Sequence, residues 1–470
     1  ANMQYLQRDF HIQRVIKLEQ NYRSHAHILD AANALIGHNR RRLGKNLWTA
    51  EGRGEPLRVV EASTDFDEAS YIVQEVRSLK ADGVPLGQIG LLYRSNAQSR
   101  VLEHALFNAA LPYRVYGGLR FFERQEIKHA LAYLRLVASG DDDGAFLRIV
   151  NFPTRGVGAR SIEQIQEISR ERGMTLWAAA CANTLSGKAA ASIAGFVRLV
   201  ENMRIATAGL PLAEVIEHVI DASGLQQHYK NEREGADRLE NLAELINAAA
   251  SFVSEREIPV AGDEGGEELD DLTAFLSHAA LEAGEHQAIA GADALQLMTV
   301  HSAKGLEFHT VFVSGLEEGL FPHENSLTEA DGIEEERRLM YVALTRARRR
   351  LYLIYTQSRM LHGQTRFNVP SRFFQEIPAE LMHKVRSAGR ASPHAYGGAA
   401  RNYSTSIPTQ PALQPASSPW RIGQSVMHQK FGAGVIVSAE GRGPDARVQV
   451  NFRDSGLKWL MLEYAKLEPA

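Results

Sequence analysis

The most constraining feature of the sequence is an alternation of helix and strand patterns that stops, gives way to helices alone, and later resumes. Residues 28–36 and 69–79 place apolar side chains at the spacing of amphipathic helices, and Ser24 stands where the first would take its N-cap. Residues 89–93 form a short apolar run that indicates a buried strand. Strand–helix–strand order is typical of a parallel sheet with helical crossovers, which predicts an α/β domain.

The α/β pattern is interrupted once. Residues 117–290 carry helical periodicity with almost no strand signal, and the strand pattern then returns at residues 295–300, 309–314 and 351–355. We therefore predict one α/β domain, formed by residues 20–116 and 291–385, with a helical insertion between the two parts.

The C-terminal part of the chain has a different texture. Residues 386–419 are rich in Ser, Pro, Gly and Ala, which predicts a flexible linker. Residues 420–470 carry short strand patterns separated by glycines, which predicts a small β-barrel.

Composition excludes several classes of protein. The 52 Lys and Arg against 56 Asp and Glu give a net charge of −4, so any nucleic-acid site must be a local patch. The single cysteine, Cys181, cannot form an internal disulfide and fits a reducing cytosol. No apolar run approaches the roughly 20 residues of a membrane span, so no membrane partner is expected.

Several common site motifs are absent from the sequence. Neither Gly44-Lys45 nor Gly187-Lys188 is followed by Ser or Thr, so there is no Walker A phosphate loop. Cysteine clusters and the His-Glu-x-x-His pattern are missing, so no metal site is predicted. Residues 141–144, Asp-Asp-Asp-Gly, lack the spacing of a calcium loop and are interpreted as a turn.

Three polar segments adjoin predicted strands, and ligands in open α/β sheets bind at the carboxyl ends of strands. Residues 296–308 run from a strand into a loop that carries a hydroxyl, an imidazole, a cation and a carboxylate; a solvated connection fits equally well. Residues 334–348 form a helix that begins with acidic residues and ends at Arg346, which is suited to phosphate recognition, or form a salt-bridged surface helix. Residues 92–100 suit a backbone contact to nucleic acid or a capped helix start.

Taken together, these segments resemble the C-terminal half of UvrD-type DNA helicases, in the UvrD/Rep/PcrA branch of superfamily one. The resemblance covers nearly the whole chain, and the segments that carry it are residues 18–24 (LEQNYRS), 91–100 (LLYRSNAQSR), 116–128 (YGGLRFFERQEIK), 275–284 (FLSHAALEAG), 298–308 and 334–348. The closing barrel resembles the Tudor-like tail of that family.

The resemblance implies an ATP-driven motor that moves 3′ to 5′ on single-stranded DNA in repair and replication. This chain would hold the second RecA-like domain (2A, residues 20–116 and 291–385), its insertion (2B, 117–290) and the tail. Residues 1–19 resemble the end of a first motor domain.

The resemblance also assigns roles to residues. Arg23 and Arg346 would be arginine fingers on the γ-phosphate of ATP, and Gly305 and Glu307 would lie at the nucleotide. The residues that would line the single-stranded DNA track are Arg94, Asn96, Thr299 and His301. The residues of the insertion that would hold duplex phosphates, in a segment that also fits a helix–helix turn, are Arg155, Gly156, Gly158 and Arg160. His362 stands at the tip of a segment resembling the strand-separating pin, where relatives carry tyrosine.

The P-loop, the Asp-Glu box for magnesium and the adenine-contacting glutamine of the family are missing. We therefore expect ATP and Mg²⁺ to be used by the full-length protein, and this chain alone to lack ATPase activity. The expected partners are single-stranded DNA, single/double-strand junctions, an N-terminal motor domain, RNA polymerase and mismatch- or excision-repair proteins, in a bacterial cytoplasm at the nucleoid. The alternative is a non-catalytic module that binds DNA or protein.

Overall fold

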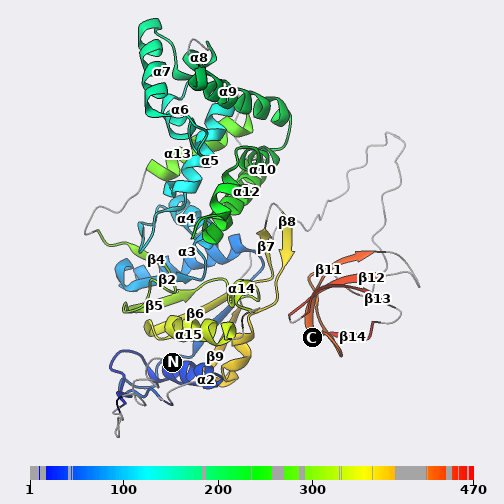
Figure 1. Cartoon of the computed structure of the whole chain (residues 1–470). Coiled ribbons are helices and arrows are strands. Elements are labelled where there is room, and N and C mark those ends of the chain that lie inside the picture. Colours follow the sequence, from blue (N-terminus) through cyan, green and yellow to red (C-terminus); the bar gives the residue numbers. More distant parts are fainter. Residues whose placement is uncertain are drawn as a thin grey trace, which may run out of the picture.

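The structure is a computed structural model of the 470-residue chain (Figure 1). It describes residues 10, 17–40, 44, 46–182, 187–233, 235–256, 269–284, 292–327, 329, 331–361, 364–386, 420, 422–440, 447–453, 455–462 and 465–469.

A seven-stranded, all-parallel sheet organises the α/β domain. Its strand order is β3-β4-β2-β5-β6-β1-β9. The strands are β1 (Leu57–Ala62), β2 (Ile89–Tyr93), β3 (Tyr113–Val115), β4 (Leu295–Thr299), β5 (Phe308–Val313), β6 (Ala347–Thr356) and β9 (Met382–Arg386). Every residue of β2 is buried, as expected for a central strand covered on both faces.

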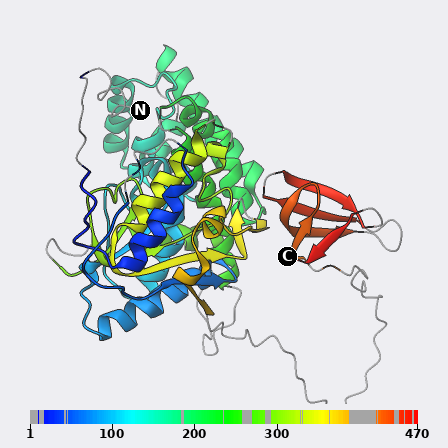
Figure 2. The ribbon, with the colours of Figure 1, turned by 90° about the horizontal axis from the view of Figure 1, so that it is seen from below.

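Helices cover both faces of this sheet. Helices α2 (Ala26–Gly37) and α15 (Gly332–Leu344) lie side by side on one face (Figures 1 and 2), and their apolar side chains join one core cluster with the strands. Helices α3 (Asp65–Ala81) and α4 (Ser99–Asn108) contribute to the cluster on the other face. The layered arrangement confirms the α/β fold class predicted from the alternating pattern.

Local sequence explains where α3 begins. The Thr64 hydroxyl accepts a hydrogen bond from the Asp67 backbone N–H, and the Asp67 carboxylate accepts one from the Thr64 backbone N–H, which is a capping box. Helix α2 begins differently from the prediction. Its N-cap is His25, and the Ser24 hydroxyl instead donates to the Ala347 carbonyl at 2.7 Å, which joins the start of α2 to β6.

The insertion leaves the sheet after β3 and returns at β4, which pairs directly with β3. Its helices share a separate core (upper part of Figure 1). They are α5 (Gln125–Ala138), α6 (Asp143–Ile149), α7 (Ala159–Arg172), α8 (Leu176–Cys181), α9 (Gly187–Thr207), α10 (Leu212–Ala222), α11 (Leu225–Lys230), α12 (Gly235–Arg256) and α13 (Asp271–Gly284). The interpretation of residues 141–144 as a turn was wrong in part, because the Asp142 carboxylate caps α6 by accepting from the Ala145 N–H at 2.7 Å.

Short elements complete the α/β domain. They are α14 (Glu324–Leu327) and the 3₁₀ helices η1 (Leu86–Gln88), η2 (Asn96–Gln98), η4 (Arg372–Glu376) and η5 (Ala379–Leu381); a further 3₁₀ helix, η3 (Phe121–Glu123), belongs to the insertion. After β6, strands β7 (Ser358–Leu361) and β8 (Gln364–Phe367) pair as an antiparallel hairpin.

The C-terminal residues form a five-stranded antiparallel sheet with its own small core, drawn at the right of Figure 1. The strands are β10 (Ser425–His428), β11 (Gly432–Glu440), β12 (Arg447–Phe452), β13 (Gly456–Met461) and β14 (Leu467–Pro469). This confirms the predicted β-structure of the tail. The linker predicted at residues 386–419 lies outside the described residues, apart from Arg386 at the end of β9.

Candidate functional site

Three side chains far apart in the sequence meet at the amino-terminal ends of β5 and β6. Glu307 directly precedes β5, Arg346 directly precedes β6, and Arg23 lies ahead of α2 and forms an ion pair with Glu307. The Asn21 side chain holds the Arg23 loop by accepting from the backbone N–H groups of Arg23 (2.8 Å) and Ser24 (2.9 Å). The structure therefore brings the two arginines and the glutamate together.

The guanidinium of Arg346 is anchored by the backbone around it. Its Nη1 donates to the Leu306 carbonyl at 2.8 Å and its Nε donates to the Val342 carbonyl at 3.1 Å. Burial lowers the pKa of Arg346, and the positive charge of Arg23 lowers it further. Two cations held this near each other favour an anion between or beside them.

An open hollow lies beside these arginines. Its lining residues are Leu18, Gln20, Asn21, Tyr22, Arg23, Leu47, Tyr341, Thr345 and Arg346. The lining offers guanidinium, amide and hydroxyl groups, and none of these described residues is a carboxylate. The hollow therefore fits phosphate oxygens and does not supply the acidic ligands that Mg²⁺ prefers. Gly305, with φ of +95°, adopts a left-handed conformation in the loop that leads to Glu307.

The other predicted residues of the α/β domain lie at the carboxyl ends of the strands, which we call the opposite edge of the sheet. Arg94 and Asn96 follow β2, and Thr299 ends the neighbouring strand β4, with His301 two residues later. Burial lowers the pKa of His301, and the nearby Arg94 charge lowers it further, so the imidazole is neutral near pH 7. The structure brings Arg94 and His301 within electrostatic range of each other.

Carboxylates already occupy part of this edge. Glu336, which is almost fully buried in α15, accepts a bidentate pair from Arg94, with Nε–Oε2 of 3.0 Å and Nη2–Oε1 of 2.7 Å. Glu240 reaches over from α12 of the insertion, accepts from the Ser95 hydroxyl and lies 3.1 Å from His323 Nε2. The hydrogen bond to Glu240 raises the pKa of His323. Sequence reasoning missed both glutamates, because only the fold brings them to the end of β2.

The two predicted arginines of the insertion differ in their environment: Arg155 binds backbone carbonyls and Arg160 is exposed. Arg155 donates from Nη1 to the Pro153 carbonyl (2.8 Å) and from Nη2 to the Ser223 carbonyl (2.6 Å), so its guanidinium ties the loop to the insertion. Arg160 is exposed in the first turn of α7, and Gly158 is the N-cap of that helix. Gly156 adopts φ of +77° and is exposed.

The last predicted site residue, His362, lies outside the described residues, between β7 and β8. The base of that hairpin is described. Arg359 in β7 is mostly buried and pairs with Glu68 of α3 and with Glu317, whose Oε2 lies 2.7 Å from Arg359 Nε. These two carboxylates were also missed by sequence reasoning, since neither belongs to a recognisable motif.

The principle that ligands bind at carboxyl ends of strands holds for only part of the predicted site. It fits Arg94, Asn96, Thr299 and His301, whereas Arg23, Glu307 and Arg346 lie at the amino-terminal ends of β5 and β6. The reason is that residues 300–307 run back across the sheet between two parallel strands. One short segment therefore reaches both edges.

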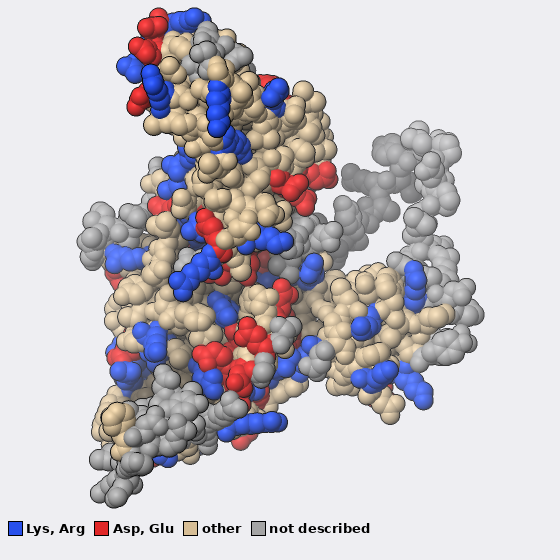
Figure 3. Space-filling model, viewed as in Figure 1, with Lys and Arg blue, Asp and Glu red and all other residues tan. Residues whose placement is uncertain are grey.

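Charge on the surface is mixed. On the face drawn in Figure 3, acidic and basic side chains are interspersed over the α/β domain, and the charged side chains visible on the C-terminal β-structure are basic. Among the described residues, no helix combines the length and apolarity needed to cross a membrane.

Comparisons with known proteins agree with this geometry. The model of a family described as UvrD-like helicase C-terminal domain matches residues 16–358, and that of the PcrA/UvrD tudor domain matches residues 422–468. DNA helicase II of Escherichia coli (strain K12) is 47% identical over 474 residues, which cover 99% of this chain and 63% of the relative. The ATP-dependent DNA helicase PcrA of Bacillus subtilis (strain 168) is 37% identical over 494 residues, which cover 100% of this chain and 64% of the relative.

The chain thus spans a little under two thirds of the length of these relatives. Both the central α/β region with its insertion and the C-terminal β-structure match models from one group of helicases. The chain belongs to the UvrD-like helicase C-terminal domain family.

Proposed function

We propose that this chain is the C-terminal portion of an ATP-dependent 3′–5′ DNA helicase that acts in DNA repair and replication. The observation that carries the proposal is the meeting of Arg23, Arg346 and Glu307 at one edge of the sheet that bears Arg94 and His301 at the other. The names of the relatives, DNA helicase II and ATP-dependent DNA helicase PcrA, support the same activity.

At the first edge, Arg23 and Arg346 would act as arginine fingers. Guanidinium groups donate in a planar fork that matches phosphate oxygens, and they stabilise charge on a phosphoryl group in transfer. Glu307 would accept a ribose hydroxyl, and Gly305 would let the backbone approach the nucleotide. Arg23 would have to exchange its ion pair with Glu307 for the phosphate.

The chain would act on ATP that is held mainly by other residues. Its sequence has no Gly-Lys-Ser/Thr loop, and the hollow beside Arg346 is lined by no described carboxylate. The phosphate loop and the Mg²⁺ ligands would therefore belong to a first motor domain, and this chain alone would not hydrolyse ATP.

At the second edge, Arg94, Asn96, Thr299 and His301 would line the track of single-stranded DNA. A cation, an amide, a hydroxyl and a neutral imidazole suit a sequence-tolerant grip through phosphates and base stacking. Arg94 is paired with Glu336, so a DNA phosphate would compete with that carboxylate. Because both edges belong to one rigid sheet, closure around ATP would move the DNA contacts with it.

The insertion would hold the duplex ahead of the junction. Arg160 is exposed at the start of α7, where helix N–H groups and a cation favour a phosphate, with Gly156 and Gly158 permitting close approach. Arg155 would shape this loop from within. His362 would stack on the base pair at the junction as the tip of the pin.

We propose the domain boundaries predicted above for 2A, 2B, the linker and the tail. Two separate core clusters on the sheet faces and a third within the insertion support the division into 2A and 2B. The cellular site would be the bacterial cytoplasm, at the nucleoid.

The test is to combine this chain with the part of Escherichia coli DNA helicase II that the chain does not cover. We expect no ATP turnover by either part alone and turnover stimulated by single-stranded DNA when they are combined. Arg346→Ala should abolish turnover and leave DNA affinity within about twofold. Arg349→Ala, which removes an exposed arginine from the same strand β6, is the control and should leave both unchanged.

ATP turnover by this chain alone would refute the proposed division of labour. Loss of both turnover and DNA binding in Arg346→Ala would assign that residue a role in folding.

A second candidate function is binding of protein partners by the tail. Strand β13 is an edge strand and exposes Leu457, Trp459 and Met461 on alternate positions, beside Lys458 and Arg447. An exposed apolar edge strand with basic neighbours suits addition of a partner strand. The expected partners are RNA polymerase and mismatch- or excision-repair proteins. Unaltered capture of polymerase after deletion of residues 386–470 would exclude this role.

A further inference from the structure

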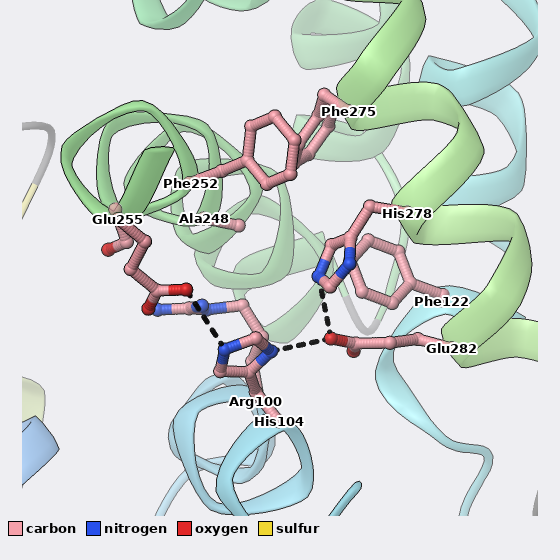
Figure 4. A pocket seen from close by; sticks show the side chains of 10 residues that line it. Arg100, His104, Phe122, Ala248, Phe252, Glu255, Phe275, His278 and Glu282 are labelled. Carbon is pink, nitrogen blue, oxygen red and sulfur yellow. Dashed lines mark hydrogen bonds and ion pairs between the residues drawn. The ribbon is translucent and has the colours of Figure 1, made fainter. Parts of the chain in front are cut away.

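Two histidines and one glutamate, residue types that commonly bind metal ions, lie together where the insertion meets the α/β domain. His104 projects from α4, and His278 and Glu282 project from α13 of the insertion (Figure 4). The spacing of four residues places His278 and Glu282 one helical turn apart on the same face of α13. None of these residues takes part in either edge of the sheet described above.

The donor atoms already face one another. Glu282 Oε1 lies 2.6 Å from His104 Nδ1 and 2.9 Å from His278 Nε2, and the donor atoms of all three lie within 4.8 Å of one another. The imidazole planes cross at 73°, and each ring places one nitrogen against the Glu282 carboxylate. Tetrahedral Zn²⁺ with bonds of about 2.0–2.1 Å separates its ligands by about 3.3 Å. Each contact would therefore need to widen by less than about 1 Å.

The surroundings suit a bound cation. His104 Nε2, the nitrogen that would face away from the ion, lies 3.4 Å from Oε2 of Glu255 in α12 and 3.0 Å from the Asn108 side-chain nitrogen. A carboxylate in that position fixes the tautomer of a ligating histidine and raises its basicity. Arg100 lines the same pocket, but it is paired with Glu244 at 2.5 Å, so the carboxylates of Glu255 and Glu282 remain to balance a divalent charge.

Aromatic side chains shield this group of residues from water. Phe122, Phe252 and Phe275 line the pocket (Figure 4), and the side chains of His104, His278 and Glu282 are 12%, 24% and 7% exposed. An apolar wall around polar donors strengthens their attraction for a cation. His278 is the most open of the three ligands and marks the side from which an ion or a water molecule could enter.

We propose that His104, His278 and Glu282 bind a divalent transition-metal ion of the zinc class, with a fourth position left for water. Two imidazoles and one carboxylate suit Zn²⁺ or Co²⁺, whereas Mg²⁺ and Ca²⁺ prefer oxygen ligands. The bound ion would join α4 to α13 and so fasten the insertion to the α/β domain. This role is independent of ATP and DNA.

The test uses the full 470-residue chain after treatment with a chelator. Titration with Co²⁺, followed by visible absorption, should give the intense bands of a tetrahedral site that saturate at one equivalent and disappear when Zn²⁺ is added. Calorimetric titration with Zn²⁺ should give the same stoichiometry. Mg²⁺ in large excess should not compete.

Two variants remove ligands from different helices. His104→Gln and His278→Gln should each weaken Zn²⁺ binding at least tenfold and remove the tetrahedral bands, whereas Glu255→Gln should weaken binding less. His228→Gln is the matched control, because His228 and Glu232 form another His–Glu pair at helical spacing, with Nε2–Oε1 of 3.1 Å. That variant should bind Zn²⁺ like the wild-type chain.

A thermal melt in chelator separates ligand loss from misfolding. Each variant should unfold cooperatively in chelator. Zn²⁺ should raise the melting temperature of the wild-type and His228→Gln chains and leave that of His104→Gln and His278→Gln unchanged. Absence of a saturable tetrahedral signal from the folded wild-type chain would overturn the proposal and leave a hydrogen-bonded ion cluster. Equal binding by His104→Gln, His278→Gln and His228→Gln would overturn it as well.

Discussion

Replacing Arg359 with methionine should destabilise the α/β domain far more than removing a typical surface arginine. The Arg359 side chain is 11% exposed, and it pairs with Glu68 and Glu317, which are 1% and 2% exposed. Burial raises the pKa of Glu68, while the two carboxylates raise the pKa of Arg359 well above its usual value. Methionine would keep most of the volume and leave two buried carboxylates without their cation.

The expected loss in free energy of unfolding follows from the burial of Arg359, Glu68 and Glu317. Removing one partner of a buried ion pair costs about 3–5 kcal/mol, because the remaining charge is desolvated and unpaired. Glu317 keeps its hydrogen bonds from the Thr356 N–H (2.8 Å) and the Asn368 amide (3.1 Å), so we expect the lower half of that range. A domain of 150–250 residues loses about 2–4 °C of melting temperature per kcal/mol, which predicts a fall of about 6–16 °C.

Differential scanning calorimetry on the chain measures this fall as a shift of the α/β-domain transition. Arg58→Met is the matched control, because Arg58 also contacts two glutamates, Glu55 and Glu75, but is 29% exposed. Exposed pairs contribute about 0–1 kcal/mol, so the control should shift by less than about 4 °C. Equal shifts in the two variants would refute the argument that burial decides the cost.

The remaining predictions concern the insertion. Burial lowers the pKa of His129 to about 4. The folded chain therefore protonates this imidazole at a lower pH than the unfolded chain does. Stability should therefore fall from about pH 6.5 to 4 by about 1–2 kcal/mol more in the wild-type chain than in His129→Phe, measured by urea unfolding; parallel pH profiles would contradict this. Arg160→Ala should reduce the salt dependence of duplex binding by about one unit of slope, and an unchanged slope would exclude a phosphate contact. Arg155→Ala should instead lower the stability of the insertion by about 1–3 kcal/mol in a thermal melt, since it releases the Pro153 and Ser223 carbonyls; an unaltered melt would show that the loop does not depend on it.

Long periodic elements were predictable from the sequence. The apolar spacing of residues 28–36 and 69–79 corresponds to α2 and α3, and the run at 89–93 is β2. Strands β1 and β9 were missed. Both carry charged residues among their apolar ones, so neither forms an apolar run, and β9 pairs with β1 alone at the edge of the sheet, a contact that no local pattern encodes.

The candidate site was predictable in its members and less so in its arrangement. Arg23, Glu307 and Arg346 were assigned through family resemblance, and the structure brings them together. The partners of the predicted residues were less predictable: Glu336 belongs to the segment 334–348, but it lies 242 residues from Arg94 and nothing in the sequence pairs the two. His278 and Glu282 carry a weak signal in their helical spacing, but nothing local connects them with His104.

The pairing of β3 with β4 makes the insertion a replaceable part. The polypeptide leaves β3 at Val115 and returns at Leu295, which lies opposite Tyr113. The two junctions are therefore one strand spacing apart across the sheet and two residues apart along it, roughly 8 Å in all. An insertion that joins the sheet at two points this close together can be exchanged, shortened or rotated without altering the lengths of the seven strands. A chimaera that carries another insertion between Val115 and Leu295 should therefore keep the parallel sheet and lose the contacts that Glu240 and Glu282 make with the α/β domain.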